Sequence, residues 1–320
     1  TFSPAKSISV LWALADEGTA SKIAACHHEA VAEVLGWAEE HAVRTRMGAG
    51  GLAQVKTNGI IASEFTHFDT RAGDPDLHSH VLVSNKVQGP DGKWRTIDSR
   101  GLFKQNQTLS ARYDAVLQDI LTRKMGLAFE ASPRGDGKEP VWEVAGVPQQ
   151  LIDQFSKRRA MARPVYEQLL ADFVKTHGHQ PDKRTQMRLW QSAILDTRDA
   201  KKPAESLAKM REEWRDAVNN LPDSPSLLAS LDTVLGGGCV DTRPAFFNAG
   251  DVDAHDLDER SVEVIDRLVQ KRSYFARHHI TAAVGSYLKG FRFADQGDAD
   301  RALALLTDRI VTVSYTHLTL

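Results

Sequence analysis

Apolar side chains recur every three to four positions over much of the chain, a spacing that predicts amphipathic helices. The clearest case is 20–44, where Ile23, Val31, Val34 and Ala38 share one face. The same periodicity predicts helices at 108–125, ended by Gly126, and at 148–176, 181–196 and 204–219.

Shorter segments rich in β-branched and aromatic residues predict strands at 60–67, 78–87 and 93–97. The turn-forming residues 73–75 and 89–92 separate them. We therefore expect an antiparallel meander of three strands. A further hairpin is expected from 127–130 and 141–144.

Composition changes towards the C-terminus. Residues 222–258 are rich in Pro, Gly and Asp and predict a linker or a long loop. Helical periodicity then returns, which suggests a second domain starting at 259 and reaching about 310. The last stretch, 311–320, is β-like and resembles a non-native tail from unrelated sequence, and we assign it no function. Because Thr1 begins inside a motif, we expect the chain to be a fragment.

The overall composition is ordinary for a globular protein. The chain has 320 residues, of which 42% are hydrophobic and 26% charged, with a net charge of −2. Cys26 and Cys239 are far apart, which argues against a disulfide framework or a thiolate zinc site and fits a reducing, cytoplasmic location. No apolar run is long enough for a membrane helix. Because the net charge is slightly negative, any binding of nucleic acid must use a local basic surface.

Three histidines fall within fourteen residues, at His67, His78 and His80. Positions 78 and 80 of one strand point to the same face, and His67 ends the neighbouring strand. All three should lie at one end of the hairpin, which is a layout for a divalent metal with open coordination positions. The competing interpretation is a polar sheet surface without a metal, which would be preferred for an isolated pair of histidines.

Other candidates have weaker support. Asp74 could orient a histidine or could be a turn residue before Pro75, and both interpretations stay open. Trp94 lies between Lys93 and Arg95 and could stack on a base of single-stranded DNA, or could be a core-facing residue of a solvated strand. The basic group from Lys157 to Arg163 is expected to be a solvated helix face. The other histidines, His27 among them, are expected to have no role in the metal site.

Several motifs, in this order and spacing, closely resemble those of the TrwC/TraI-type conjugative relaxases. They are Thr1-Phe2-Ser3-Pro4-Ala5-Lys6-Ser7-Ile8-Ser9, Phe65-Thr66-His67, Thr70-Arg71, Asp74-Pro75-Asp76-Leu77-His78-Ser79-His80, Asn85, Asp91-Gly92-Lys93-Trp94-Arg95, Phe155-Ser156-Lys157-Arg158 and Glu213-Trp214. The resemblance covers about 1–221, the expected relaxase domain. A shorter and weaker match at 272–278 is similar to the start of the helicase part of such proteins.

The resemblance implies an α+β fold of the HUH endonuclease type, with a central antiparallel sheet flanked by helices and followed by a mainly helical C-terminal part. It implies nicking of one DNA strand at a transfer origin by a tyrosine that forms a 5′-phosphotyrosine. His67, His78 and His80 would hold one divalent metal ion, Mg, Mn or Zn. Asp74, Arg71, Lys6, Lys93, Trp94 and Arg95 are candidates for orienting a ligand or contacting DNA. The implied partners are single-stranded DNA at the transfer origin, relaxosome proteins and type IV secretion coupling proteins.

The family's nucleophilic tyrosines and an accompanying aspartate would lie upstream of Thr1. None of Tyr113, Tyr166, Tyr274, Tyr287 and Tyr315 matches the nucleophile position, and Tyr113 is expected in a helix core. No catalytic residue is therefore identified, and this fragment should not cleave efficiently. Thr70-Arg71 also stands where the family usually has Ser-Arg. Two alternatives remain: a metal-bound single-stranded DNA-binding module without catalysis, and an unrelated hydrolase with a histidine-bound metal.

Overall fold

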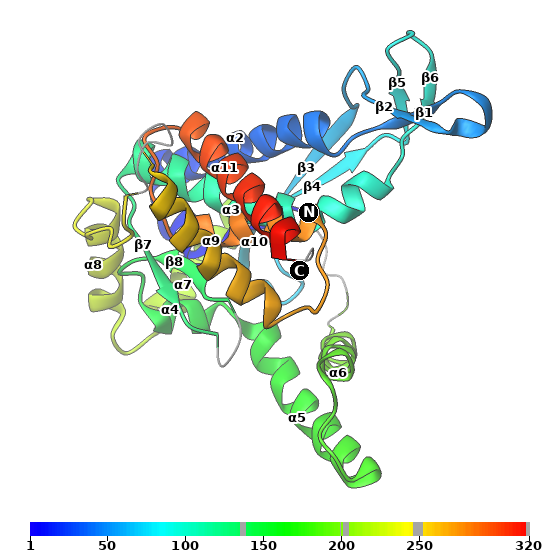
Figure 1. The fold of residues 1–320 in the computed structure, drawn as a ribbon. Helices are drawn as coiled ribbons and strands as arrows, with labels where there is room; N and C mark the ends of the chain where they lie inside the picture. The colour runs from blue at the N-terminus through cyan, green and yellow to red at the C-terminus, as the bar shows by residue number, and fades with distance from the viewer. Residues whose placement is uncertain (135–138, 199, 201–204, 246–251, 318–320) are drawn as a thin grey trace.

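A computed structural model describes residues 1–134, 139–198, 200, 205–245 and 252–317. In this part of the chain the strands form antiparallel hairpins of two strands each (Figure 1). The pairs are β1 Thr45–Met47 with β2 Ala53–Val55, β3 Ala62–Asp69 with β4 Pro75–Val83, β5 Lys86–Gln88 with β6 Trp94–Thr96, and β7 Phe129–Ser132 with β8 Val141–Val144.

Helices make up most of the remaining described structure. Their bounds are α1 Lys6–Leu14, α2 Glu17–His41, α3 Arg100–Met125, α4 Gln149–Gln154, α5 Lys157–His177, α6 Lys183–Asp196, α7 Leu207–Asn219, α8 Ser224–Leu235, α9 Ala254–Val269, α10 Arg277–Leu288 and α11 Gln296–His317. A short 3-10 turn, Ala49–Gly51, joins β1 to β2. The expected α+β class is confirmed. Gly126 ends α3 in the left-handed conformation, as the sequence predicted.

The prediction of a three-stranded meander is wrong for the third strand, whereas the first two strands pair as expected. The apolar run 78–87 is not one strand: it stops at Val83, bends at Ser84-Asn85 and restarts as β5. The segment expected as the third strand, β6, therefore pairs with β5 and not with β4. In Figure 1 the β1–β2 and β5–β6 hairpins lie together beyond the end of α2, away from the helical body.

One hydrophobic core holds α1, α2, α3, β4 and the β7–β8 hairpin together. Its fully buried members include Leu11, Val31, Leu77, Leu117 and Phe129. Because Leu77 belongs to β4, the inner face of the histidine-bearing hairpin is anchored in this core. A second cluster joins α9, α10 and α11. Helix α10 approaches α3 closely, since a Cβ on Gly285 would lie 3.4 Å from the Cβ of Ala111.

Two expectations for the C-terminal third need revision at the level of elements. The segment expected as a linker, 222–258, contains α8, whose Leu227, Leu231 and Val234 repeat at helical spacing and enter the first core. The residues 246–251 lie outside the described part. The stretch 311–317 is helical, not β-like, because continuing α11 keeps Ile310 and Val311 packed against the second cluster.

Within the described residues, no helix is both long and apolar enough to cross a lipid bilayer.

Candidate metal centre

The three predicted histidines meet on the exposed face of the β3–β4 hairpin. His67 pairs directly with His78, and Phe65 pairs with His80, so the alternation of side chains puts all three imidazoles on one face. Their ring centroids are 5.0 to 5.2 Å apart. One nitrogen from each ring can be chosen so that all three lie within 4.8 Å of one another. The prediction that the cluster lies at one end of the hairpin is confirmed.

Hydrogen bonds orient two of these rings. The Nδ1 of His78 donates to the backbone carbonyl of Asp76 at 2.8 Å, and the Asp76 carboxylate lies 3.4 Å from the same nitrogen. The Nδ1 of His80 lies 2.9 Å from the Thr1 hydroxyl. Both interactions use Nδ1, so the Nε2 atoms of His78 and His80 are available to bind a metal, which is the usual arrangement around histidine ligands. The donor set therefore fits a divalent metal with three imidazole ligands.

The turn that joins the two ligand strands is fixed to the core. The Trp214 indole donates to the Gly73 carbonyl at 2.8 Å, and Trp214 packs against Trp12. Trp12 in turn stacks on Phe68 at 5.5 Å between ring centroids. Because Phe68 follows His67, this aromatic group holds both the turn and the end of β3. We infer that packing against the hydrophobic core keeps the two ligand strands in their relative position.

Asp74 lies in this turn, almost fully buried, and its partner is Lys157. Its Oδ2 accepts from the backbone N–H of Lys157 at 2.9 Å, and its Oδ1 lies 3.5 Å from the Lys157 ammonium. Burial raises the pKa of Asp74, although the charges of Lys6 and Lys157 oppose this effect. Asp74 thus ties the start of α5 to the hairpin, and the carboxylate beside a histidine is that of Asp76. The sequence signal for Asp76 was its position two residues before His78 on the same strand face.

The remaining candidates fall into two groups. Lys6 is near the centre: its ammonium donates to the Pro75 carbonyl at 2.6 Å, and burial lowers the pKa of Lys6. Arg71 is exposed in the turn between the ligand strands. Lys93, Trp94 and Arg95 instead lie on the distant β5–β6 hairpin (Figure 1). There Trp94 is 57% exposed, so it is not a core residue, and Arg95 pairs with Asp91.

Large apolar side chains are exposed beside the histidines, a feature that the sequence did not reveal. Phe65 is 52% exposed and Leu82 is 68% exposed, and both lie on the same hairpin face as the cluster. Because side chains alternate along a strand, Phe65 and Leu82 could have been assigned to the histidine face once the strand pairing was known. Together with the histidines they form a surface that is polar at the hairpin end and apolar further along.

None of the tyrosines whose side chains are described makes a hydrogen bond or a ring contact with the cluster. Tyr113 is buried in α3, as expected, and its hydroxyl lies 2.6 Å from the Nδ1 of His27. Tyr166 packs edge-on against Trp190, Tyr287 packs near Phe291, and Tyr274 is exposed. The described tyrosines thus supply no nucleophile aimed at the metal centre.

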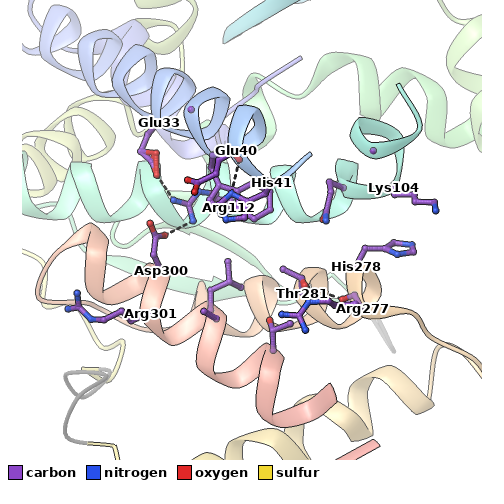
Figure 2. A pocket seen from close by; sticks show the side chains of 17 residues that line it. Glu33, Glu40, His41, Lys104, Arg112, Arg277, His278, Thr281, Asp300 and Arg301 are labelled. Carbon is purple, nitrogen blue, oxygen red and sulfur yellow. Dashed lines mark hydrogen bonds and ion pairs between the residues drawn. The ribbon is translucent and has the colours of Figure 1, made fainter. Parts of the chain in front are cut away.

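A separate hollow of about 960 Å³ lies between α2, α3, α10 and α11, and none of the three histidines lines it (Figure 2). Arg112 dominates this hollow. It forms ion pairs with Glu33 of α2 and Asp300 of α11, and it lies over the ring of Trp37. This region joins the two hydrophobic clusters and is distinct from the metal centre.

Comparison with known proteins agrees with the geometry of the cluster. A family model described as "TrwC relaxase" matches residues 1–221. The chain belongs to the TrwC relaxase family. The resemblance drawn from the motifs is therefore confirmed, and the unrelated hydrolase is not supported.

Two curated relatives are both described as "Multifunctional conjugation protein TraI", one from Escherichia coli and one from its strain K12. The first is 28% identical over 255 residues and the second 25% identical over 276 residues, covering 74% and 82% of this chain. This chain spans 14% of the length of each of them.

Solved structures of the conjugative relaxase TrwC in complex with OriT DNA are similar to this chain. A metal-free structure is 27% identical with a TM-score of 0.54, covering 68% of this chain and 71% of that one. A metal-bound structure is 26% identical with the same TM-score, covering 71% and 70%.

Proposed function

We propose that this chain is the relaxase part of a conjugative transfer protein that nicks one DNA strand at a transfer origin. The carrying observation is the His67, His78 and His80 cluster, in which one ring nitrogen from each residue lies within 4.8 Å of the other two, in a chain of the TrwC relaxase family. The similar TrwC structures were determined with OriT DNA, which supports single-stranded DNA at a transfer origin as the substrate.

The three imidazoles would hold one divalent ion, Mg, Mn or Zn, which when bound polarises a phosphoryl oxygen as a Lewis acid. The other roles belong to this chain. Asp76 keeps the His78 ring in its tautomer, and Thr1 orients His80. Arg71 is placed in the exposed turn to contact a phosphate, and Phe65 offers an exposed aromatic face beside the cluster.

A tyrosine oxygen would attack the scissile phosphate, break its P–O3′ bond and release the other strand end as a free 3′-hydroxyl. The tyrosine would remain attached to the 5′ phosphate, which conserves the energy of the bond for rejoining. Because no described tyrosine contacts the cluster, we propose that the nucleophile and its assisting aspartate come from residues upstream of Thr1. Residues 1–320 alone should then bind metal and DNA without cutting.

The broader assignments are part of the same proposal. Residues 1–221 would form the relaxase domain, with α8 and the rest of 222–258 leading to a helicase-like part that starts at 259. The partners would be relaxosome proteins and type IV secretion coupling proteins, and the location would be the cytoplasm. The free cysteines Cys26 and Cys239 are compatible with a reducing compartment.

The metal site can be tested by calorimetric titration of residues 1–320 with Mn²⁺ or Zn²⁺. His78→Ala should abolish binding, because one of three ligands is lost. His255→Ala is the matched control, since His255 is exposed on α9 and should leave the affinity unchanged. Wild-type affinity in His78→Ala would reject the site.

Nicking can be tested by comparing residues 1–320 with the same chain extended through its upstream coding sequence. We expect only the extended chain to form a covalent adduct with an oligonucleotide from its transfer origin, detected on a denaturing gel. His67→Ala should remove that adduct. No adduct from the extended chain would contradict the proposed nicking activity, and an adduct from residues 1–320 would contradict the upstream nucleophile.

A further inference from the structure

A chain of hydrogen bonds, buried at Ser79, His27 and Tyr113, lies directly behind the metal-binding strand. Ser79 stands between His78 and His80, so its side chain points to the opposite, buried face of β4. Its hydroxyl is 2.6 Å from Oε1 of Glu64 on β3 and 2.8 Å from Nε2 of His27 on α2. The His27 Nδ1 is 2.6 Å from the Tyr113 hydroxyl on α3. His27 and Ser79 have no exposed surface.

The proton positions along this chain are mutually determined. The Glu64 carboxylate only accepts, so the Ser79 hydroxyl donates to it, and the Ser79 oxygen must accept from Nε2–H of His27. The Nδ1 of His27 is then an acceptor, and the Tyr113 hydroxyl donates to it. This assignment needs a neutral His27. Burial, helped by the nearby charge of His28, lowers the pKa of His27 to about 4, in agreement with it.

The same serine also carries the backbone contact with the N-terminal segment. Phe2 and Ser79 exchange both backbone hydrogen bonds at 2.9 Å, and the Phe2 ring packs 5.2 Å from that of Tyr113. Thr1, the partner of His80, therefore reaches its place through Phe2. A shift of Ser79 would move His78, His80 and Thr1 together.

We propose that His27 is a positioning residue of the metal centre, which acts through Ser79 to hold His78 and His80 in ligand geometry. The inference rests on the proposed metal site and adds a residue to it. Outer hydrogen-bond partners of metal ligands typically change metal affinity by about 10 to 100-fold when removed. His27 acts one step further away, but its hydrogen bond ends between two ligands on the same strand.

Two amide substitutions separate the two hydrogen bonds of His27, which are Nε2 to Ser79 and Nδ1 to Tyr113. In His27→Gln, the amide nitrogen can take the place of Nε2 and donate to Ser79. In His27→Asn, the shorter amide can replace only the acceptor that faces Tyr113. We therefore expect Co²⁺ affinity, followed by d–d absorption of the full chain, to stay within about threefold of wild type in His27→Gln. It should fall by about 10-fold or more in His27→Asn.

Tyr113→Phe is the control for a purely structural role, because it removes the hydrogen bond to Nδ1 of His27 and keeps the one to Ser79. It should lower the thermal midpoint while leaving the Co²⁺ spectrum and affinity unchanged. Ser79→Ala should reproduce the loss seen in His27→Asn, and Ser79→Thr should restore the affinity. This pair decides the matter if the His27 variants fail to fold.

The outcomes distinguish the two levels of the proposal. A wild-type chain that binds no Co²⁺ would overturn the metal site and the positioning role together. A wild-type chain that binds Co²⁺ with the same affinity and spectrum as His27→Asn and Ser79→Ala would overturn the positioning role alone. Losses of affinity that follow the thermal midpoint across all the variants, Tyr113→Phe included, would also overturn it.

Discussion

At the scale of single residues, histidines of two kinds lie on opposite faces of β4. His78 and His80 face outward and were predicted, because two histidines one position apart share a strand face. His27 lies behind the strand and is buried at 0% exposure. We expected no role for it, because a lone histidine on an apolar helix face is usually a core residue. His27 differs from an ordinary core histidine because it hydrogen-bonds to Ser79, which links α2 to β4.

The neutral state of His27 predicts how stability depends on pH. Its pKa is about 4 in the folded chain and near 6.5 when unfolded, so between these values only the unfolded chain takes up the proton. The contribution is therefore complete above pH 6.5 and is lost as the pH falls towards 4. The size is on the order of 3 kcal/mol, at 1.36 kcal/mol per pKa unit.

Urea unfolding at pH 7 and at pH 4.5, compared between wild type and His27→Gln, measures this effect. The free energy of unfolding should fall more in wild type than in the variant. The groups that act on His27 are Tyr113, Ser79, Glu64, His28 and His78, and they remain in both proteins. Equal losses in the two proteins would show that His27 does not carry the pH dependence.

At the scale of elements, the β3–β4 hairpin is the unit that assembles the metal centre, and its turn is anchored from two directions. Trp214 of α7 holds the Gly73 carbonyl, and Asp74 accepts from the first backbone N–H of α5. Both contacts join residues more than 80 positions apart, so no local pattern could indicate them. The sequence did predict the turn itself, from Gly73, Asp74 and Pro75.

Asp74→Ala should therefore destabilise the chain through the loss of the contact with α5. The backbone N–H of Lys157, whose hydrogen bond is partly buried, would lose a charged acceptor, at a cost of about 1–3 kcal/mol. Asp91→Ala is a suitable control, because Asp91 and Arg95 form an exposed pair that contributes little to stability. Chemical denaturation checks both variants, and equal stability of the two would contradict the anchoring role of Asp74.

At the scale of the whole molecule, the net charge of −2 gives no general attraction for DNA. Binding must come from a local surface, and the hairpin end offers Arg71 and Lys157 near the cluster. Of the C-terminal helices, α10 packs on α3, and Arg112 of α3 forms ion pairs with α2 and α11. Figure 1 shows α10 and α11 beside α3, on the helical body and not on the outlying β1–β2 and β5–β6 hairpins.

Single-stranded oligonucleotide binding should weaken steeply as salt rises, because phosphate contacts release counterions. Fluorescence anisotropy between 50 and 200 mM salt measures the slope of log affinity against log salt. Arg71→Ala should reduce that slope by about 0.7 if it makes one phosphate contact. Arg301→Ala, distant from the hairpin, should leave it unchanged. A slope near zero in wild type would contradict binding through phosphates.

The sequence by itself determined the α+β class, the main helices, the family and the gathering of His67, His78 and His80 at one hairpin end. The helices and the gathering of the histidines follow from local periodicity, turn residues and a strand period of two, which act over a few neighbouring positions. The fold class and the family follow from the resemblance of the motifs to those of the conjugative relaxases. Only the tertiary structure decided the separate pairing of β6, the packing of α8, and the contacts of His27 and Thr1. His27 lies 86 positions from Tyr113 and 52 from Ser79, and Thr1 lies 79 from His80. The contacts of His27 form only when the core brings α2, α3 and β4 together, because a buried imidazole is stable there when it is hydrogen-bonded. Thr1 reaches His80 because the adjacent Phe2 pairs with Ser79 through the backbone.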